Sequence, residues 1–517
     1  MKRLLPLLVG FLLLLPSGLS AQAGSWPHPC GTPAGKSDWL KNYQRNPEAF
    51  RRGNDTTLYV PLTIHILGND DGEGYYRVSR LKEAFCQLNE SFSDANIQFF
   101  IAGDLNYLDN SEWYSHETVL EGAAMMFENN VAGTLNIYFV SDPAGNCGYN
   151  LPYAGIAMRK SCSGPNDNTW AHEIGHALSI PHPFLGWEGG VSHDGSVNHD
   201  FGLPAPAQVT YDYTFFQDTL IQDTTIIDTA IVELVDGSNC QVAADGFCDT
   251  SPDYIAQRWF CNADGESPTM QTDPNGASFR SDGTLIMGYS DDACQARFTQ
   301  EQIAAMRADL FNEHSDLISE TPPLPPLASG VTTLLTPEEG AVTPYDEVLI
   351  SWAPVEHATA YILQVSPFPT FGFREEFIVT APQFMVTDLV AERDYYWRVT
   401  AYNAYRFCAP MSEAGTFTTS AVSSSHSPGE LESVRLYPQP ALQGVHMAVT
   451  VYITAAAATS GQLQLLNTVG KLVHQRHVAL SPGQQALQLP VAGLPAGLYV
   501  MRFRNKEGFI AKKILIQ

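Results

Sequence analysis

Three histidines and a glutamate have the spacing of a metal site near the middle of the sequence. Residues 172–182 read HEIGHALSIPH, so His172 and His176 are four residues apart and His182 follows six residues later. Residues four apart on an α-helix differ by roughly 40° in direction, so we expect both imidazoles on one face. Two neutral imidazoles on one face make half of a tetrahedral zinc site. Glu173 lies beside the first of them, where it can reach a metal-bound water.

His182 can become a third ligand only if the helix stops before it. A continuing helix would point His182 roughly 120° away from His176. Pro181 supplies the stop, because it lacks an N–H, its ring clashes with the carbonyl of Ala177, and it disfavours a helical Ile180. We therefore predict a helix over 169–179 and a bend that brings His182 back. A bare HExxH pattern also fits packed core histidines, and the third histidine beyond a helix stop argues against that alternative.

Alternating elements must position this motif. Their apolar spacing predicts strands over 58–67, 97–102 and 135–141, and helices over 78–92, 117–129 and 298–311. This order indicates an α/β layer. A long Asp/Thr-rich insert follows the motif, with Asp-Thr at 218, 223 and 228, and a hairpin fits there.

The chain is long and acidic. Its 517 residues suggest three or four domains, and 28 Lys and Arg face 55 Asp and Glu. We expect no nucleic-acid partner, since phosphate binding needs clustered positive charge. Residues 161–257 hold no Lys or Arg at all. A solvated acidic surface, calcium sites and a preference for cationic substrates all fit that segment.

The N-terminus has the pattern of a secretion signal. A short basic region precedes an apolar run over 4–15 and a small-residue cleavage site near Ala23, so residues 1–23 are predicted to be a signal peptide. The apolar run is too short to span a bilayer. Nine cysteines in an exported chain imply disulfides and at least one leftover thiol. Cys147 and Cys162 flank a short segment and are candidate partners.

The hydrophobic pattern of the sequence changes after TPPLPPL at 321–327, which has the composition of a stiff linker. Short alternating strands with turn signals then predict two all-β modules, at 328–420 and 431–517. A Ser/Pro/Gly stretch at 423–430 separates them.

The motif and its downstream partners resemble the metzincin peptidases. HEIGHALSIPH matches the signature HExxHxxGxxH, and LIMGY at 285–289 matches the family's methionine-containing turn. FCDTSP at 247–252 and SDDACQARFTQEQ at 290–302 are similar to the pappalysin-like, or cytophagalysin, branch. The resemblance covers residues 30–312 and departs at Ser179, where the family has glycine. A serine with positive φ there costs about 1 kcal/mol in strain.

The resemblance implies a mechanism. Three neutral histidines would leave Zn²⁺ one open position for water. Glu173 would take that water's proton and pass it to the leaving amine, and the Tyr289 hydroxyl would steady the tetrahedral intermediate. Tyr289 as a packed core residue remains the alternative. Met287 would form an apolar floor beneath the histidines.

The resemblance also suggests regulation and accessory sites. Residues 24–52 would form a latency segment whose Cys30 thiolate occupies the fourth metal position, although ordinary disulfide use of Cys30 fits equally. Arg51-Arg52 is a candidate activating cleavage point, or simply an exposed basic pair. Asp249 and Thr250 lie where relatives bind Ca²⁺, with a turn as the alternative. Cys261 and Cys294 resemble a family disulfide.

Asp291 and Asp292 lie near the expected wall of the pocket for the substrate residue after the cut. There they would favour Arg or Lys, unless they face solvent.

The two C-terminal modules carry resemblances of their own. Trp352 in ISWAPV, with Leu389, Tyr395 and Trp397, is similar to a fibronectin type III sandwich. LYPQP at 436–440, LNTVGK at 466–471, LPAGLY at 494–499 and KKILI at 512–516 resemble the C-terminal sorting domain of type IX secretion substrates, with an adhesion sandwich as the alternative. The resemblance implies passage through periplasm and outer membrane by the sorting machinery, then release or surface attachment.

The sequence therefore predicts a multidomain secreted peptidase. The expected order is signal 1–23, latency segment 24–52, an α/β (α+β) metzincin catalytic domain at 53–320, and sandwich modules at 328–420 and 431–517. Protein or peptide substrates are expected, and the sequence does not address the oligomeric state. The alternatives are a secreted adhesin with a vestigial peptidase domain, and a gluzincin-type peptidase with a downstream glutamate ligand.

Overall fold

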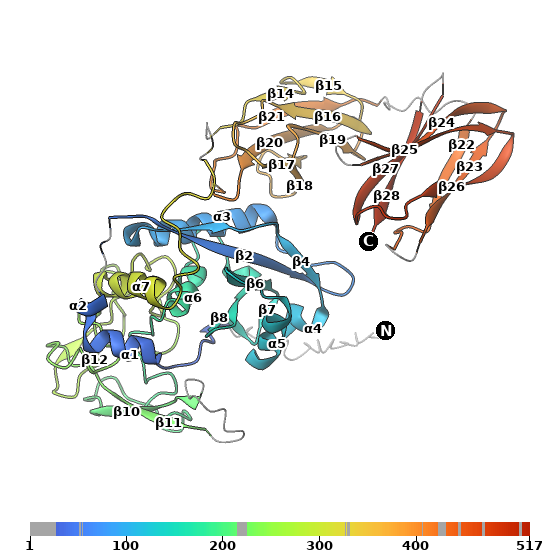
Figure 1. The fold of residues 1–517 in the computed structure, drawn as a ribbon. Coiled ribbons are helices and arrows are strands. Elements are labelled where there is room, and N and C mark those ends of the chain that lie inside the picture. The colour runs from blue at the N-terminus through green and yellow to red at the C-terminus, as the bar shows by residue number, and fades with distance from the viewer. Residues whose placement is uncertain are drawn as a thin grey trace, which may run out of the picture.

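The computed structural model shows several modules that are mostly β-sheet with few helices (Figure 1). The residues that it describes are 27–50, 53, 55–214, 225–325, 327, 331–405, 407–421, 431–442, 446–467, 471–505 and 509–517. Within these ranges, no helix is long and apolar enough to cross a membrane. The predicted signal peptide and the pair Arg51-Arg52 lie outside the described residues.

A seven-stranded sheet organises the first module. Its order is β1-β8-β9-β6-β2-β3, with β4 paired to β2, and only β8 and β9 run antiparallel to each other. The strands are β1 (His28–Cys30), β2 (Leu58–Gly68), β3 (Ile97–Ile101), β4 (Asn106–Asp109), β6 (Leu135–Val140), β8 (Asn146–Leu151) and β9 (Gly155–Arg159). The short strands β5 (Ser115–His116) and β7 (Asp142–Pro143) pair separately. All but one residue of β2 is buried, as expected for a strand covered on both faces.

Helices cover this sheet and carry the motif. They are α1 (Asp38–Arg45), α2 (Pro47–Phe50), α3 (Val78–Ser91), α4 (Ser111–Tyr114), α5 (Val119–Asn129), α6 (Thr169–Ala177) and α7 (Gln300–Asn312), with 3-10 turns at Ser93–Ala95 and Lys160–Cys162. Capping boxes start α5 at Thr118 and α7 at Thr299, which satisfies backbone N–H groups that a helix end leaves free. Ile174 on α6 and Met306 on α7 belong to one buried core with β2 and β6.

Short strands and disulfides shape the segment between α6 and α7. The strand β10 (Gln208–Asp212) pairs antiparallel with β11 (Ile227–Ile231), so the predicted hairpin is present, although residues 215–224 lie outside the described part. A second small pair joins β12 (Gln271–Thr272) to β13 (Ser278–Phe279). Disulfides link Cys240 to Cys248 and Cys261 to Cys294.

Four further sheets follow the linker. Two contain β14 (Leu334–Thr336), β15 (Ala341–Thr343), β16 (Glu347–Trp352), β17 (Ala360–Ser366), β18 (Glu375–Val379), β19 (Gln383–Thr387), β20 (Asp394–Tyr402) and β21 (Gly415–Thr419). Two contain β22 (Leu431–Tyr437), β23 (Ala448–Ala455), β24 (Thr459–Asn467), β25 (Leu472–Leu480), β26 (Gly483–Pro490), β27 (Gly497–Arg504) and β28 (Phe509–Ile516). Trp352 and Trp397 are fully buried, and the Val390 N–H donates to the Tyr395 hydroxyl at 2.9 Å. The arrangement is consistent with sandwich modules.

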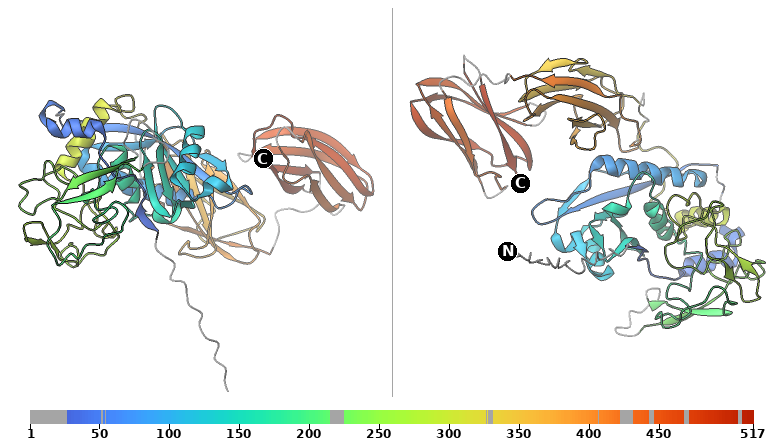
Figure 2. Two further views of the ribbon diagram at one scale, coloured as in Figure 1. Left: turned by 90° about the horizontal axis from the view of Figure 1, so that it is seen from below. Right: turned by 180° about the vertical axis from the view of Figure 1, so that it is seen from behind.

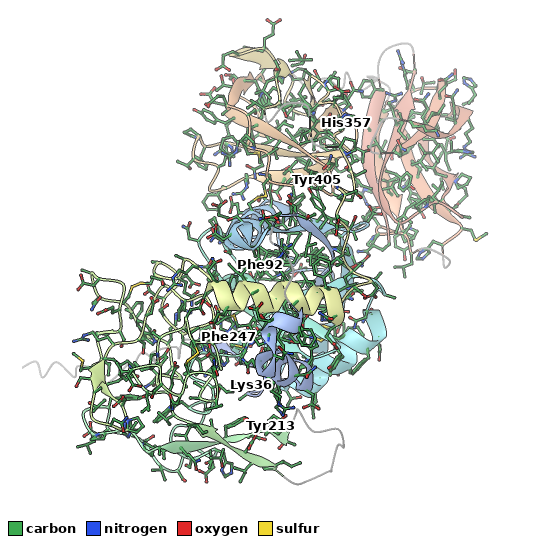
Figure 3. The ribbon with its side chains drawn as sticks, turned by 60° about the vertical axis from the view of Figure 1, so that its left-hand side comes forward. Lys36, Phe92, Tyr213, Phe247, His357 and Tyr405 are labelled. Atoms are coloured by element: carbon green, nitrogen blue, oxygen red, sulfur yellow. A yellow bond between two sulfur atoms is a disulfide. The ribbon has the colours of Figure 1, made fainter. Side chains whose placement is uncertain are left out.

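The first of these β-modules is attached to the motif-bearing module. A disulfide joins Cys86 on α3 to Cys408. The Ile101 N–H donates to the Ala404 carbonyl at 3.0 Å. Tyr405 lies where the two modules meet, and its ring centroid is 5.6 Å from that of Tyr59 (Figure 3). The last module lies at the opposite end of the molecule from α7 in both views of Figure 2.

Candidate metal centre

The three imidazoles of the motif point their Nε2 atoms at one another. The Nε2 atom of His172 lies 3.1 Å from that of His176 and 3.2 Å from that of His182. The third separation, between His176 and His182, is 3.1 Å. A tetrahedral ion with metal–nitrogen bonds of about 2.0–2.1 Å would hold its donors roughly 3.3 Å apart. The observed triangle therefore fits a divalent metal ion above its centre.

Hydrogen bonds fix which ring nitrogen faces that point. The Nδ1 atom of His172 lies 2.8 Å from the Ile286 carbonyl oxygen, and Nδ1 of His176 lies 2.7 Å from the Ile180 carbonyl oxygen. A carbonyl can only accept, so both Nδ1 atoms carry hydrogen and the Nε2 lone pairs face inward. Converging lone pairs repel unless a cation lies between them. The donor set therefore fits a metal ion, and its orientation is the one that metal-binding histidines usually have.

Burial keeps these imidazoles in the form that binds metals. It lowers the pKa of His172 to about 4, and the pKa values of His176 and His182 fall well below the usual range. Desolvation is the largest cause, because a buried ring loses hydration when it becomes charged. At neutral pH all three rings are therefore neutral donors.

The bend that returns His182 to the site begins at Ser179 rather than at Pro181. The helix α6 ends at Ala177, two residues earlier than predicted. Ser179 adopts a left-handed backbone with φ of 68°, and the Ile180 N–H donates to the Gly175 carbonyl at 2.9 Å. These features form a Schellman-type helix end, which closes the last turn without help from proline. Pro181 then keeps the chain from resuming the helix.

Glu173 lies fully buried beside the imidazoles. Its Oε2 accepts a hydrogen bond from Thr32 Oγ1 at 2.8 Å, and the Cys30 thiol lies 3.6 Å from the same oxygen. Burial raises its pKa to about 8. Desolvation is the largest cause, because a buried carboxylate loses its hydration. The side chain packs on Gly148 of β8, where a Cβ would lie 2.9 Å from Glu173 Cγ.

Met287 and Tyr289 line the floor and one wall of the site. Met287 is fully buried under α6, where a Cβ on Gly175 would lie 2.4 Å from its Sδ. The ring of Tyr289 lies 4.9 Å from that of His182, centroid to centroid, and its hydroxyl donates to the Cys30 carbonyl at 3.3 Å. Burial raises the pKa of Tyr289 well above its usual value, so the hydroxyl remains a donor.

The N-terminal segment occupies the edge of the sheet at this site. The strand β1 pairs parallel with β8, and the Gly31 N–H donates to the Gly148 carbonyl at 2.8 Å. Cys30 is a buried free thiol, and the other eight cysteines are paired. Its Sγ and the donor nitrogens of the three histidines all lie within 4.8 Å of one another. The structure therefore favours a place at the metal site for Cys30 over a disulfide.

A cavity of about 380 Å³ opens beside the imidazoles at the far end of β8. Its lining includes Thr32, Asn150, His176, Leu317 and Glu313. Thr32 also accepts the Asn150 N–H at 2.8 Å, so the N-terminal segment forms one wall of this cavity. The volume lies within the range of ordinary ligand pockets.

The side chains of the two predicted calcium residues, Asp249 and Thr250, bind different partners. Asp249 is exposed, and its carboxylate accepts the Glu301 N–H at 2.9 Å in the first turn of α7. An acid at a helix N-terminus is favourable in its own right, so Asp249 already has a structural partner. Thr250 is buried, and its hydroxyl donates to the Asp245 carboxylate at 3.1 Å.

A different pair of acids lies buried beside Thr250. Glu233 and Asp245 each have one carboxylate oxygen with no hydrogen-bond partner among the described residues. Burial and the nearby charge of Asp245 raise the pKa of Glu233 to about 9. Burial raises the pKa of Asp245 to about 7. Lys36 of the N-terminal segment is the nearby cation, and burial lowers its pKa to about 8 (Figure 3). Unpaired buried carboxylates of this kind fit a bound cation.

The acidic wall expected at residues 291–292 is partly neutralised. Arg258 forms an ion pair with Asp292, whose other oxygen accepts the Asn168 N–H at 3.0 Å. Asp291 accepts the Cys261 N–H at 3.2 Å. Neither carboxylate is free to attract a substrate cation without competition from these partners.

Both predicted disulfides are present, whereas two residues that contact the site were not predicted. Cys147 pairs with Cys162, and Cys261 pairs with Cys294. Glu188, which lies 3.4 Å from His182 Nδ1, and Thr32, which holds Glu173, have no spacing signal that would mark them. Burial raises the pKa of Glu188 to about 7.

Two sequence comparisons bear on this site and on secretion. A profile described as "Secretion system C-terminal sorting domain" matches residues 435–517. An "Extracellular metalloprotease" from Colletotrichum graminicola is 26% identical over 220 residues, which cover 36% of this chain and 76% of that protein. This distant similarity supports a metalloprotease-related chain. The sorting domain indicates type IX secretion to the cell surface or the extracellular space.

Among solved structures, this chain has low similarity to fibronectin type III domains. The FN1-FN3 domains of chicken CNTN1 are 17% identical, with 36% of this chain and 67% of that chain covered and a TM-score of 0.16. A fibronectin type III domain derived from human KIAA0970 protein is 19% identical, with 20% and 80% covered and a TM-score of 0.15. TM-scores this low carry no argument about this fold.

Proposed function

We propose that this chain is a secreted zinc-dependent endopeptidase of the metzincin, pappalysin-like kind. The observation that carries the proposal is the convergence of three inward-facing Nε2 atoms beside a buried glutamate. The catalytic domain would span residues 53–320. The distant extracellular metalloprotease relative supports the same activity.

Zinc is the ion that the donor set favours. Three neutral imidazoles in a tetrahedral arrangement with one position left over are typical of catalytic zinc sites. Zinc held there by His172, His176 and His182 would acidify a bound water and polarise the scissile carbonyl. A gluzincin-type site would use a downstream glutamate instead of His182. The 3.1 and 3.2 Å separations of His182 Nε2 from the other two argue against that alternative.

Glu173 would act as the general base. Its buried carboxylate, next to the imidazoles, would accept the water's proton and later give it to the leaving amine. The Tyr289 hydroxyl would donate to the carbonyl oxygen as that oxygen gains charge. Tyr289 donates to the Cys30 carbonyl at 3.3 Å, and on this proposal that carbonyl would take the place of the substrate carbonyl.

Residues 24–52 would keep the peptidase latent. The strand β1 already fills the edge of β8, and Thr32 already binds Glu173, so a substrate strand and the general base are both blocked. Cys30 would supply the fourth metal ligand as a thiolate, since coordination to a metal deprotonates a thiol. Activation would require removal of this segment.

A calcium ion would stabilise the segment near residue 245. Calcium prefers carboxylate and other oxygen ligands, and Glu233, Asp245 and Thr250 offer them in a buried position. Asp249, predicted together with Thr250 from the family pattern, stays a proposed ligand, with one carboxylate oxygen bound to the start of α7.

The remaining modules would deliver and present the peptidase. Residues 328–420 would form a fibronectin type III-like module, and residues 431–517 would be the sorting domain that the secretion machinery removes. The competing function is an adhesin with a vestigial peptidase domain. The intact set of three histidines and Glu173 argues against it, because a relic would not need to keep all four.

Cleavage of casein by zinc-loaded protein tests the proposal. The wild-type chain, freed of residues 24–52, is expected to digest casein, and Glu173→Ala is expected to lower kcat by roughly 10²-fold or more while one zinc per chain remains bound. Equal cleavage by wild type and Glu173→Ala would refute the peptidase proposal. Zinc-loaded wild type that cleaves no casein or peptide-library substrate would favour the adhesin.

A further inference from the structure

Ser179 stands at the helix end where the resembling peptidases have glycine. Its φ of 68° lies in the left-handed region, which strains any side chain with a Cβ. Serine must therefore either be a tolerated defect or contribute something that glycine lacks. Its hydroxyl donates to Asp309 Oδ2 at 2.7 Å, a short hydrogen bond to a carboxylate.

Asp309 is well placed to hold this hydroxyl. The carboxylate belongs to α7 and is fully buried. Its other oxygen, Oδ1, lies 3.4 Å from His314 Nε2 without forming a hydrogen bond, so among the described residues the Ser179 hydroxyl is the hydrogen-bond partner of this carboxylate. The helix α7 is itself fixed by the Thr299 capping box and by the core that it shares with α6.

The bend that begins at Ser179 carries two groups of the candidate metal site, the Ile180 carbonyl and His182. The next carbonyl, that of Ile180, accepts the hydrogen bond from His176 Nδ1 at 2.7 Å. His182 follows two residues further along the same bend. A shift of the backbone at residue 179 would therefore move the support of one imidazole and the position of another. Small displacements of this kind weaken metal sites, because ligand orientation depends on the groups behind the ligands.

We propose that Ser179 and Asp309 are a positioning pair for the metal site, by which α7 holds the bend that carries His182. The proposal rests on the proposed function and adds to it a link between α7 and the imidazoles. The Ser37 hydroxyl of the N-terminal segment lies 3.4 Å from the Ser179 hydroxyl. That contact would be lost on activation, whereas the bond between Ser179 and Asp309 lies within the catalytic domain and persists.

The two interpretations predict opposite changes in stability and metal retention when Ser179 is replaced by glycine. If the hydroxyl is incidental, Ser179→Gly removes backbone strain and yields a protein at least as stable and as metal-retentive as wild type. If the hydroxyl positions the bend, Ser179→Gly loses the anchor and retains metal less well despite the relief of strain. Ser179→Asn is the conservative rescue, because asparagine tolerates the left-handed region and its amide can donate to Asp309.

The test measures zinc release to a chelator in the full chain and thermal unfolding of the metal-free chain. We expect Ser179→Gly and Asp309→Ala to release zinc about 10-fold faster or more, with a lower unfolding midpoint for metal-free Ser179→Gly. Ser179→Asn should recover most of the zinc retention. Ser238→Gly, at an exposed serine elsewhere in the same module, is the matched control and should change neither measurement.

Two results would overturn the inference alone. One is zinc release from Ser179→Gly at the wild-type rate, and the other is an unfolding midpoint at or above that of wild type. A wild-type chain that takes up no zinc would instead overturn the proposed function together with this inference.

Discussion

At the residue scale, one short segment interferes with several steps of the proposed reaction. The Cys30 thiol lies beside the three imidazoles, and the Cys30 carbonyl accepts the hydrogen bond of the Tyr289 hydroxyl. The Thr32 hydroxyl donates a hydrogen bond to the Glu173 carboxylate. Each contact removes a group that catalysis requires in a free state. Latency would therefore rest on several weak blocks that act together rather than on the thiol alone.

Cys30→Ala should raise the activity of the uncleaved chain. We expect casein hydrolysis by the zinc-loaded full chain to increase about tenfold, which corresponds to about 1.4 kcal/mol of lost inhibition. Complete activation is not expected, because β1 would still fill the edge of β8. Thr32→Ala is the comparison variant and should give a smaller increase.

The result is meaningful only if the Cys30→Ala activity disappears when Glu173→Ala is added. Uncleaved Cys30→Ala with the activity of uncleaved wild type would contradict the role of the thiol.

The residues of the motif could be predicted from sequence, but their supports could not. His172, Glu173, His176 and His182 stand in one short segment, so helical spacing and a helix stop before His182 sufficed to predict that they meet, although the stop is made at Ser179 and not by the proline. Thr32 and Glu188 reach the same site from other segments, and no local pattern connects them to it. The acids beside Thr250 also come from separate segments, since Glu233 lies beyond the hairpin, so no local pattern connects them, and calcium binding by Asp249 and Thr250 stays a prediction.

At the element scale, the helix α6 can approach the methionine turn closely because residue 175 is a glycine. A Cβ at residue 175 would lie 2.4 Å from Met287 Sδ, well inside van der Waals contact. The methionine turn also supplies the Ile286 carbonyl that binds His172 Nδ1. The turn and the helix must therefore approach closely to align the first ligand.

Gly175→Ala should destabilise the module and weaken metal binding. Overpacking of a buried contact costs about 1–3 kcal/mol, which chemical denaturation of the metal-free chain would measure as a lower midpoint. Adding Met287→Ala should recover part of the loss. Gly372→Ala, where the nearest atom to a new Cβ lies 3.8 Å away, is the neutral control. An unchanged midpoint for Gly175→Ala would show that the close contact is not significant.

Periodicity predicted most elements of the first module well. The helices expected over 78–92 and 298–311 are observed as α3 and α7, with ends shifted by at most two residues. The strand expected over 58–67 is β2. The predicted end of the motif helix was wrong by two residues, because the Schellman-type closure at Ser179 depends on backbone conformation, which proline content does not reveal.

At the scale of the whole molecule, the first β-module is fastened to the motif-bearing module. The disulfide between Cys86 and Cys408 closes a sequence separation of 322 residues. Phe407 and Ile362 also belong to the core of the first module. The sequence pattern predicted two modules joined by a stiff linker. It could not reveal that these modules share a core and a disulfide, because the pairing of cysteines does not follow from local sequence.

Loss of this disulfide should loosen the joint between the modules. The double variant Cys86→Ser with Cys408→Ser should lose about 2–4 kcal/mol of stability and become sensitive to limited proteolysis in the linker over 321–327. The double variant Cys240→Ser with Cys248→Ser is the comparison, because its bond closes a separation of only 8 residues and should matter less. Equal denaturation midpoints and equal protease resistance for wild type and the Cys86/Cys408 variant would contradict a fastened joint.

The central claim is that three imidazoles from both sides of one bend hold a single zinc ion. The most direct measurement is the zinc content of purified full chain after dialysis, compared between wild type and His182→Ala. We predict one zinc per chain for wild type and an affinity lowered by about 10-fold or more for His182→Ala, with the fold retained by circular dichroism. Wild type without stoichiometric zinc, or His182→Ala that binds zinc as tightly as wild type, would contradict the account.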